Sequence, residues 1–236
     1  MKKLKIIVFS SFVVLIGIAT LTGCSFDNTS SPTSTIVSKT EEKKTEEEIK
    51  SNIEKEVMGI TKSGDYVIKL KNNNDTQIYV DNVSIRFFDA EGNFTKKENS
   101  QDSYFCIPAN TEVVTYIWGH NEDFDKYANS EIEVMLGDPL YDYYTENFEI
   151  KANDTKENIA VTITNNNDVK LDCIKINVSF IKDNKIVGIE SGISYDEGIE
   201  ANGGKAYINV DYPVDEDYEE VSFDKFEVYL ISAYDN

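Results

Sequence analysis

The chain has 236 residues, of which 43 are acidic and 23 are basic, and its formal net charge at pH 7 is −20. This charge repels nucleic acid and anionic polymers, which argues against a DNA- or RNA-binding protein. Arg86 is the single arginine, which argues against an arginine clamp for phosphate or carboxylate groups. Apolar residues make up 40% of the chain, and its 14 Tyr and 12 Phe indicate folded domains rather than a disordered acidic tail.

The N-terminus is typical of a secretory signal peptide. Three lysines lie within the first five residues, and residues 6–18 form an apolar run that is too short to span a bilayer. Small residues then lead to Cys24. The stretch Leu21–Cys24 resembles the lipobox of bacterial lipoproteins. This resemblance implies cleavage before Cys24, transfer of a diacylglycerol to its sulfur, and a lipid anchor at the extracellular face of the cell membrane.

The charge and composition change along the chain and suggest its organisation. We expect a signal peptide at 1–23 and a tether at 24–52 that begins with the lipidated Cys24. The tether is rich in Ser and Thr and then in Glu and Lys, and it lacks the apolar residues needed for a core. We therefore expect a flexible linker, with at most a transient helix in its charged part. Two domains are expected to follow, at 53–144 and 145–236.

An internal repeat is the evidence for the two predicted domains. Asn72–Asp75 matches Asn165–Asp168 at an offset of 93 residues. Two later landmarks recur in the same order, 107–110 with 199–202 and 133–136 with 227–230. A period near 93 is too long for a solenoid repeat and is the size of a small domain, so it predicts two tandem copies of one fold.

The pattern within each copy predicts an all-β fold. Apolar residues alternate with polar ones in three segments per copy, which indicates strands with one buried face. These segments are 66–71, 83–87 and 132–136 in the first copy, and 159–163, 176–180 and 226–230 in the second. Turn residues at 89–92 and 182–185 predict a hairpin at the same place in each copy. We expect β-sandwiches of about seven strands.

The first copy also resembles a known kind of module. Asn72–Asn74, the strand Val83–Asp89 and Gly92 are similar to the immunoglobulin-like modules found in lipoproteins of Gram-positive bacteria, including the type named for its FxLYD motif. The resemblance implies two tandem immunoglobulin-like β-sandwiches that serve as binding or spacer units.

Residues suited to catalysis are scarce. His120 is the single histidine, and no serine or cysteine lies in a nucleophile motif, so we expect a protein that is not an enzyme. Too few Cys and His residues are present for a zinc site, and we expect neither a metal nor a cofactor. Cys106 and Cys173 do not fall at matching positions of the two copies, and we interpret them as apolar free thiols rather than a disulfide.

Two other features leave alternatives open. The acidic segments 122–125 and 216–219 are equivalent and suggest either calcium binding or, as we prefer, solvated turns whose Phe124 and Tyr218 plug the sandwich. Tyr141, Tyr143 and Tyr144 lie between the copies, where they form either a platform for sugars or, preferably, an interdomain contact.

The sequence favours a surface-anchored lipoprotein that acts as a binding or spacer module at the cell envelope. Its partners are the membrane, through the lipid on Cys24, and an unidentified protein or glycan. A solute-binding or carbohydrate-binding accessory lipoprotein and a calcium-dependent adhesion module are the alternatives. A hydrolase that uses two of the many carboxylates, as glycosidases do, is disfavoured by the lack of a catalytic constellation.

Overall fold

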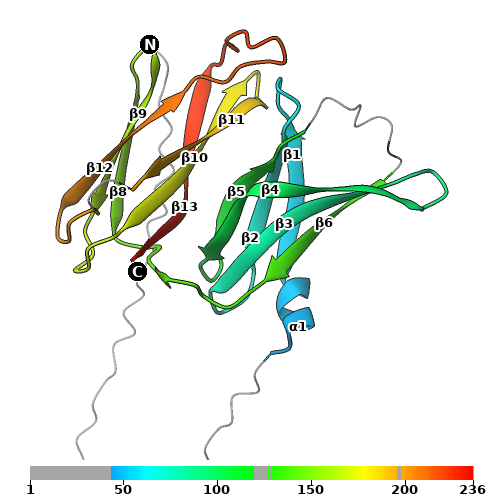
Figure 1. Cartoon of the computed structure of the whole chain (residues 1–236), viewed down its shortest axis with the longest axis horizontal. Coiled ribbons are helices and arrows are strands. Elements are labelled where there is room, and N and C mark those ends of the chain that lie inside the picture. The colour runs from blue at the N-terminus through cyan, green and yellow to red at the C-terminus, as the bar shows by residue number, and fades with distance from the viewer. Residues whose placement is uncertain (1–43, 120–126, 128, 196–197, 236) are drawn as a thin grey trace, which may run out of the picture.

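The computed structural model describes residues 44–119, 127, 129–195 and 198–235. Apart from one short helix, α1 (Glu46–Ser51), the regular structure of these residues consists of antiparallel strands, which confirms the expected all-β sandwich fold. No helix in this part of the chain is long and apolar enough to cross a membrane. Figure 1 shows two groups of strands, one from each half of the chain, lying side by side.

The first half forms a folded six-stranded sheet in the order β1-β2-β5-β4-β3-β6. Its strands are β1 (Ile53–Ile60), β2 (Tyr66–Asn72), β3 (Ile78–Phe88), β4 (Phe94–Ile107), β5 (Glu112–Ile117) and β6 (Asn129–Leu136). Strands β4 and β5 pair at one position alone, Ser100 with Ile117. The sheet therefore divides there into two parts, and side chains from both parts, such as Leu70 and Phe87, share one buried core.

The second half repeats this strand order. Its strands are β7 (Asp142–Tyr143), β8 (Phe148–Asp154), β9 (Asn158–Asn165), β10 (Cys173–Lys182), β11 (Lys185–Ser194), β12 (Gly204–Asp211) and β13 (Lys225–Asp235). Sheet β8-β9-β12 corresponds to β1-β2-β5, and β11-β10-β13 corresponds to β4-β3-β6. The common order supports a duplication, whereas the independence of the two halves as domains stays a prediction.

Each half has six such strands among the described residues, rather than the seven expected. The additional strand β7 comes from the connection between the halves. It pairs with the end of β13, where Tyr143 lies opposite Tyr234. The connection thus extends a sheet of the second half instead of completing the first.

Equivalent asparagines explain why the repeat is visible in the sequence. Asn72 is fully buried, and its side-chain amide donates to the backbone carbonyls of Thr76, Ile107 and Pro108 at 2.9–3.0 Å. Its amide oxygen accepts from the backbone N–H of Asn74. Because buried polar groups need partners, this side chain fixes three backbone segments at once.

Asn165 makes the same connections in the second half. It donates to the carbonyls of Val169, Ile199 and Glu200 and accepts from the backbone of Asn167. In the sequence these asparagines marked the repeat. The structure shows that Asn72 and Asn165 also clamp the neighbouring turns from inside each half.

The folded part begins earlier than the expected boundary at residue 53. Thr45 and Glu48 form a capping box that stabilises the start of α1. Ile49 packs against the first core, and the side chain of Asn52 donates to that of Asn74 at 3.3 Å. Ile49 and the contact between Asn52 and Asn74 therefore attach residues 44–52, the end of the predicted tether, to the first half.

Candidate functional site

The two halves meet through an apolar contact. Val67 and Tyr116 lie on the faces of β2 and β5 that point away from the first core. Both are nevertheless buried, because they pack with Ile189 of β11 and Tyr229 of β13. Removal of this apolar surface from water favours association of the halves.

A β-bulge strengthens the same contact. Ile176 pairs with Leu230 and Lys175 pairs with Ser232, so Ile231 is an extra residue in β13. Ile231 is 3% exposed and belongs to the buried core of the first half. The bulge therefore places a side chain of the second half in the other core.

A buried polar network crosses the contact beside these apolar residues. Asp102 of β4 is fully buried, and its carboxylate lies 2.5 Å from the Lys175 ammonium. The same carboxylate accepts hydrogen bonds of 2.7 Å from Asn177 and Thr115. Asn177 in turn accepts from Ser191 at 2.7 Å. Charge and hydrogen bonds thus compensate the burial of Asp102 and fix how the halves meet.

Tyrosines gather next to this contact, on the molecular surface. We call this group the tyrosine cluster. Ring contacts join Tyr79, Tyr141, Tyr143 and Tyr234. Two more exposed tyrosines border these four: Tyr104, whose backbone carbonyl accepts from Tyr143, and Tyr195, which is near enough to add to the effect of burial in raising the pKa of Tyr234. Its members come from both halves and from the connection between them. The preferred interpretation of the junction residues, that they pack between the halves, is confirmed for Tyr143, which contacts Tyr79 of the first half and Tyr234 of the second. Tyr141 stacks on Tyr234, and Tyr144 packs against the core of the second half.

Ring contacts hold the cluster together. Tyr141 stacks on Tyr234 with ring centroids 4.2 Å apart, and Tyr143 packs edge-on against Tyr234 at 5.9 Å. Tyr79 lies 5.9 Å from Tyr143 on the other side. The Tyr143 hydroxyl donates to the backbone carbonyl of Tyr104 at 2.7 Å. These contacts give the rings fixed orientations.

The cluster is only half-covered. Tyr104 is 49% exposed and Tyr195 is 64% exposed, while the other four are partly buried. Burial raises the pKa of Tyr143 to about 12, with smaller contributions from Cys106 and neighbouring tyrosines. At neutral pH this phenol therefore keeps its proton and acts as a neutral donor. The exposed rings of Tyr104 and Tyr195 thus border four rings that are fixed by mutual contacts, and such aromatic surfaces are well suited to binding.

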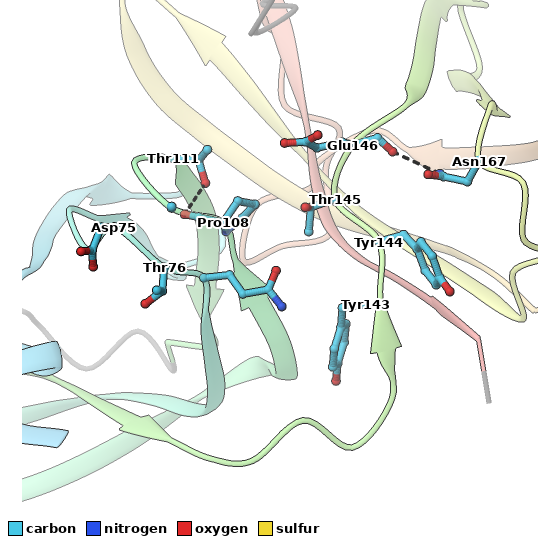
Figure 2. A pocket seen from close by; sticks show the side chains of 11 residues that line it. Asp75, Thr76, Pro108, Thr111, Tyr143, Tyr144, Thr145, Glu146 and Asn167 are labelled. Carbon is cyan, nitrogen blue, oxygen red and sulfur yellow. Dashed lines mark hydrogen bonds between the residues drawn. The ribbon is translucent and has the colours of Figure 1, made fainter. Parts of the chain in front are cut away.

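Two hollows open on either side of Tyr143. The first, the turn hollow, has a volume of about 460 Å³. Figure 2 shows Thr76 and Pro108 on one side of it, and Tyr143 and Thr145 on the other. Two acidic residues, Asp75 and Glu146, line it, and Asp75 is paired with Lys44 at 2.6 Å, at the start of the described chain.

The second, the bulge hollow, has a volume of about 360 Å³. It is lined by aromatic, small and acidic residues: Tyr79, Val80, Asp81, Tyr104, Phe105, Gly137, Asp138, Leu140 and Tyr143. No basic residue belongs to this lining. The tyrosine cluster therefore borders two hollows. In the turn hollow one of the acidic residues is paired with a lysine, and in the bulge hollow the charged lining residues are both acidic.

Some residues proposed from the sequence lie outside the described part of the chain. These are Cys24, His120 and the acidic segment 122–125 with Phe124. The lipid anchor therefore stays a prediction, and no geometry supports a role for His120.

The acidic segment 216–219 does lie in the described part. Tyr218 is 86% exposed with a positive φ of 62°, so the expectation that it plugs the sandwich is wrong. The tight turn around Asp215, which accepts from the backbone N–H groups of Asp217 and Glu219, directs Tyr218 outward. Across the described residues, no group of three or more Asp, Glu, His or Cys is placed to hold a metal ion.

The two later cysteines are free and buried, which confirms their interpretation as apolar thiols. Burial raises the pKa of the Cys106 thiol to about 12, so this sulfur stays protonated. Cys173 is 1% exposed and its pKa is also raised by burial. Neither sulfur is a reactive thiolate.

Sequence reasoning did not find most of this site. Tyr79, Tyr104 and Tyr234 lie in different strands, and no spacing links them. The polar network around Asp102 was missed for the same reason. The useful signal was an apolar residue on the outward side of a strand, such as Val67 between Tyr66 and Ile68, which indicates a second buried face.

Comparison with known proteins does not identify a family. No protein-family model matches the sequence, and no curated protein matches it. Among solved structures, the chain is similar to a transglutaminase from red sea bream, at 10% sequence identity and a TM-score of 0.22. That match covers 76% of this chain and 30% of the transglutaminase, and so low a TM-score carries no functional argument.

Proposed function

We propose that this chain is a non-enzymatic lipoprotein of the cell envelope. In this proposal the lipid on Cys24 holds the two β-sandwich halves at the extracellular face of the cell membrane, where they bind a protein or glycan partner. The lipobox-like stretch and the apolar run before it support the anchor. The resemblance to immunoglobulin-like modules of Gram-positive lipoproteins belongs to the same proposal.

The observation that carries the binding role is the exposed tyrosine cluster. Tyrosine is enriched where proteins recognise partners, because its ring supplies large contact area and its hydroxyl a polar contact. A pure spacer needs no such surface. Here Tyr104 and Tyr195 expose about half or more of their area next to a rigid contact between the halves.

The anchor can be tested in a bacterial host that processes lipoproteins. The wild-type chain is expected to incorporate radiolabelled palmitate and to remain with the membrane fraction. Cys24→Ser is expected to lose both the label and the membrane association. Palmitate labelling of Cys24→Ser would contradict the anchor at this residue.

The binding role can be tested with the Cys24→Ser chain as a soluble bait for envelope fractions. Tyr195→Ala removes an exposed ring of the tyrosine cluster, and Tyr207→Ala removes a ring that is 73% exposed on β12, outside the cluster. We expect a retained component that is lost with Tyr195→Ala and kept with Tyr207→Ala. Retention of nothing by any bait would favour the spacer role instead.

A further inference from the structure

Two distortions of the backbone meet at the bulge hollow. Asp81 interrupts the pairing of β3 with β6, because Val80 pairs with Leu136 and Asn82 pairs with Met135. On the other side of β3, Tyr104 has a positive φ of 53°. A bulky residue rarely adopts this conformation, and such strain is concentrated at functional sites.

The two distortions affect residues that face the same space. Val80 pairs with Phe105 and Asn82 pairs with Ser103, so Asp81 and Tyr104 occupy corresponding positions on β3 and β4. Both line the bulge hollow. No residue in β11, the equivalent of β4 in the second half, has a positive φ. The distortion of β4 is therefore peculiar to the first half and is not required by the fold.

Because Gly137 has no side chain, the backbone after β6 passes close to Asp81 at the rim of the hollow. A Cβ atom at Gly137 would lie 3.2 Å from the Cβ of Asp81. The Gly137 N–H donates to the Tyr79 carbonyl at 3.1 Å, so the chain passes directly beside the bulge. Asp138 then follows at the rim and is exposed. Two carboxylates, of Asp81 and Asp138, thereby border the same hollow.

The lining selects a cation. Tyr79, Tyr104 and Tyr143 line the hollow, and the face of an aromatic ring attracts a positive charge within about 6 Å. The two carboxylates accept charge-assisted hydrogen bonds from N–H donors. The lining lacks a basic group that would bind an anion or occupy the carboxylates itself.

We propose that the bulge hollow binds a primary ammonium group, presented as a lysine side chain of the partner. This inference rests on the proposed binding function and names the chemistry that the tyrosine cluster recognises. The carboxylates favour a primary ammonium over a quaternary one, because an ammonium with N–H groups can donate to both Asp81 and Asp138 whereas a quaternary one cannot. The aromatic walls contact the methylene stem of the lysine.

The test is a titration of the soluble Cys24→Ser chain with Nα-acetyl-lysine methylamide, followed by NMR shifts. Nα-acetyl-norleucine methylamide serves as the uncharged control ligand. We expect saturable shifts at the tyrosine cluster with the lysine probe alone. Asp81→Asn and Asp138→Asn are each expected to weaken binding by about tenfold, since each loses a charge-assisted contact. Glu91→Gln, an exposed change in the β3–β4 turn, is expected to leave binding unchanged.

Each other result overturns the assignment. Binding of tetramethylammonium as tight as that of the lysine probe, or tighter, would show that the hollow binds cations without hydrogen bonds from N–H groups. Equal binding of the norleucine probe, or unchanged binding by Asp81→Asn and Asp138→Asn, would place recognition elsewhere. Melting curves of each variant separate loss of the site from loss of the fold.

The two experiments together distinguish failure of the lysine assignment from failure of the proposed binding function. If Tyr195→Ala abolishes capture of an envelope component while the lysine probe does not bind, the binding role stands and the lysine assignment is wrong. If the probe binds while no component is captured, the cation site stands and the role as an envelope-binding module is not supported.

Discussion

The carboxylate of Asp102 accepts a 2.7 Å hydrogen bond from the side-chain amide of Asn177, a residue 75 positions away in the other half. Asp102 also lies 2.5 Å from the Lys175 ammonium, and Asn177 itself donates to the Val114 carbonyl at 3.1 Å. The contact between the halves therefore has a polar centre with defined geometry. An apolar contact alone would leave their relative position less specified.

Lys175→Met is expected to destabilise the protein, because it leaves the fully buried Asp102 carboxylate without its counterion. Loss of one partner of a buried pair costs about 3 kcal/mol of unfolding free energy. Asp102→Asn in the same chain is expected to recover part of this loss, since the neutral amide still accepts from Asn177. Urea unfolding of both variants measures the difference. Lys205→Met, at an exposed position of β12, is the control, and equal losses in the two lysine variants would contradict the expectation.

Asn72→Asp and Asn165→Asp are expected to be similarly and strongly destabilising. Each substitution removes the N–H donors that bond three carbonyls and puts a carboxylate in a fully buried position. One carboxylate oxygen keeps the N–H donor of Asn74 or Asn167, but the other faces carbonyl oxygens, and this costs about 3–5 kcal/mol. Thermal unfolding at neutral pH provides the comparison.

The adjacent residues supply matched controls for this pair. Asn73→Asp and Asn166→Asp change the same amide at exposed positions, and we expect each to alter stability by no more than about 0.5 kcal/mol. A large loss for one of the buried variants and not for the other would show that the two asparagine clamps are not equivalent.

These asparagines also show which features of the fold the sequence predicts and which it does not. The repeated Asn runs located the duplication, and alternating residues such as Ile68 and Leu70 located the strands, because both signals are local. The burial of Asn72 was missed because a polar residue after a strand is ordinarily solvated. Two identical amides, Asn72 and Asn74, recurring at Asn165 and Asn167, were the signal for a structural role.

The site itself depends on contacts that no local pattern contains. Asp102 lies in the polar run 95–104, which reads as an exposed strand, and it is buried because the second half packs over it. Tyr79 and Tyr234 each contact Tyr143, which is held at this place because β7 pairs with the end of β13. Alternation can predict which face of a strand is apolar, but it does not identify the surface that covers an outward-facing residue.

Gly192→Ala is expected to be destabilising, because β11 passes close to β12 at this point. A Cβ atom there would lie 2.4 Å from the Cγ2 atom of Ile208 and 2.8 Å from that of Val210. Overpacking of this kind costs about 1–3 kcal/mol. Gly59→Ala in β1 is the matched control, since no atom lies within 4 Å of its added methyl group. The urea midpoints of the two variants give the measurement, and equal midpoints would contradict the close packing.

Glu190 gives the stability of the folded chain a dependence on pH. Burial, with smaller contributions from the nearby carboxylates of Asp65 and Asp211, raises the pKa of its carboxyl from an ordinary 4.5 to about 7. Because the folded state holds this proton more tightly than the unfolded chain, the stabilisation is complete below pH 4.5. It is lost as the pH rises towards 7.

In Glu190→Gln, the free energy of unfolding is expected to fall less between these pH values than in the wild-type chain. Urea unfolding across this range tests the slope, with the exposed change Glu157→Gln as control. Parallel pH profiles for all three proteins would exclude Glu190 as the source of the dependence.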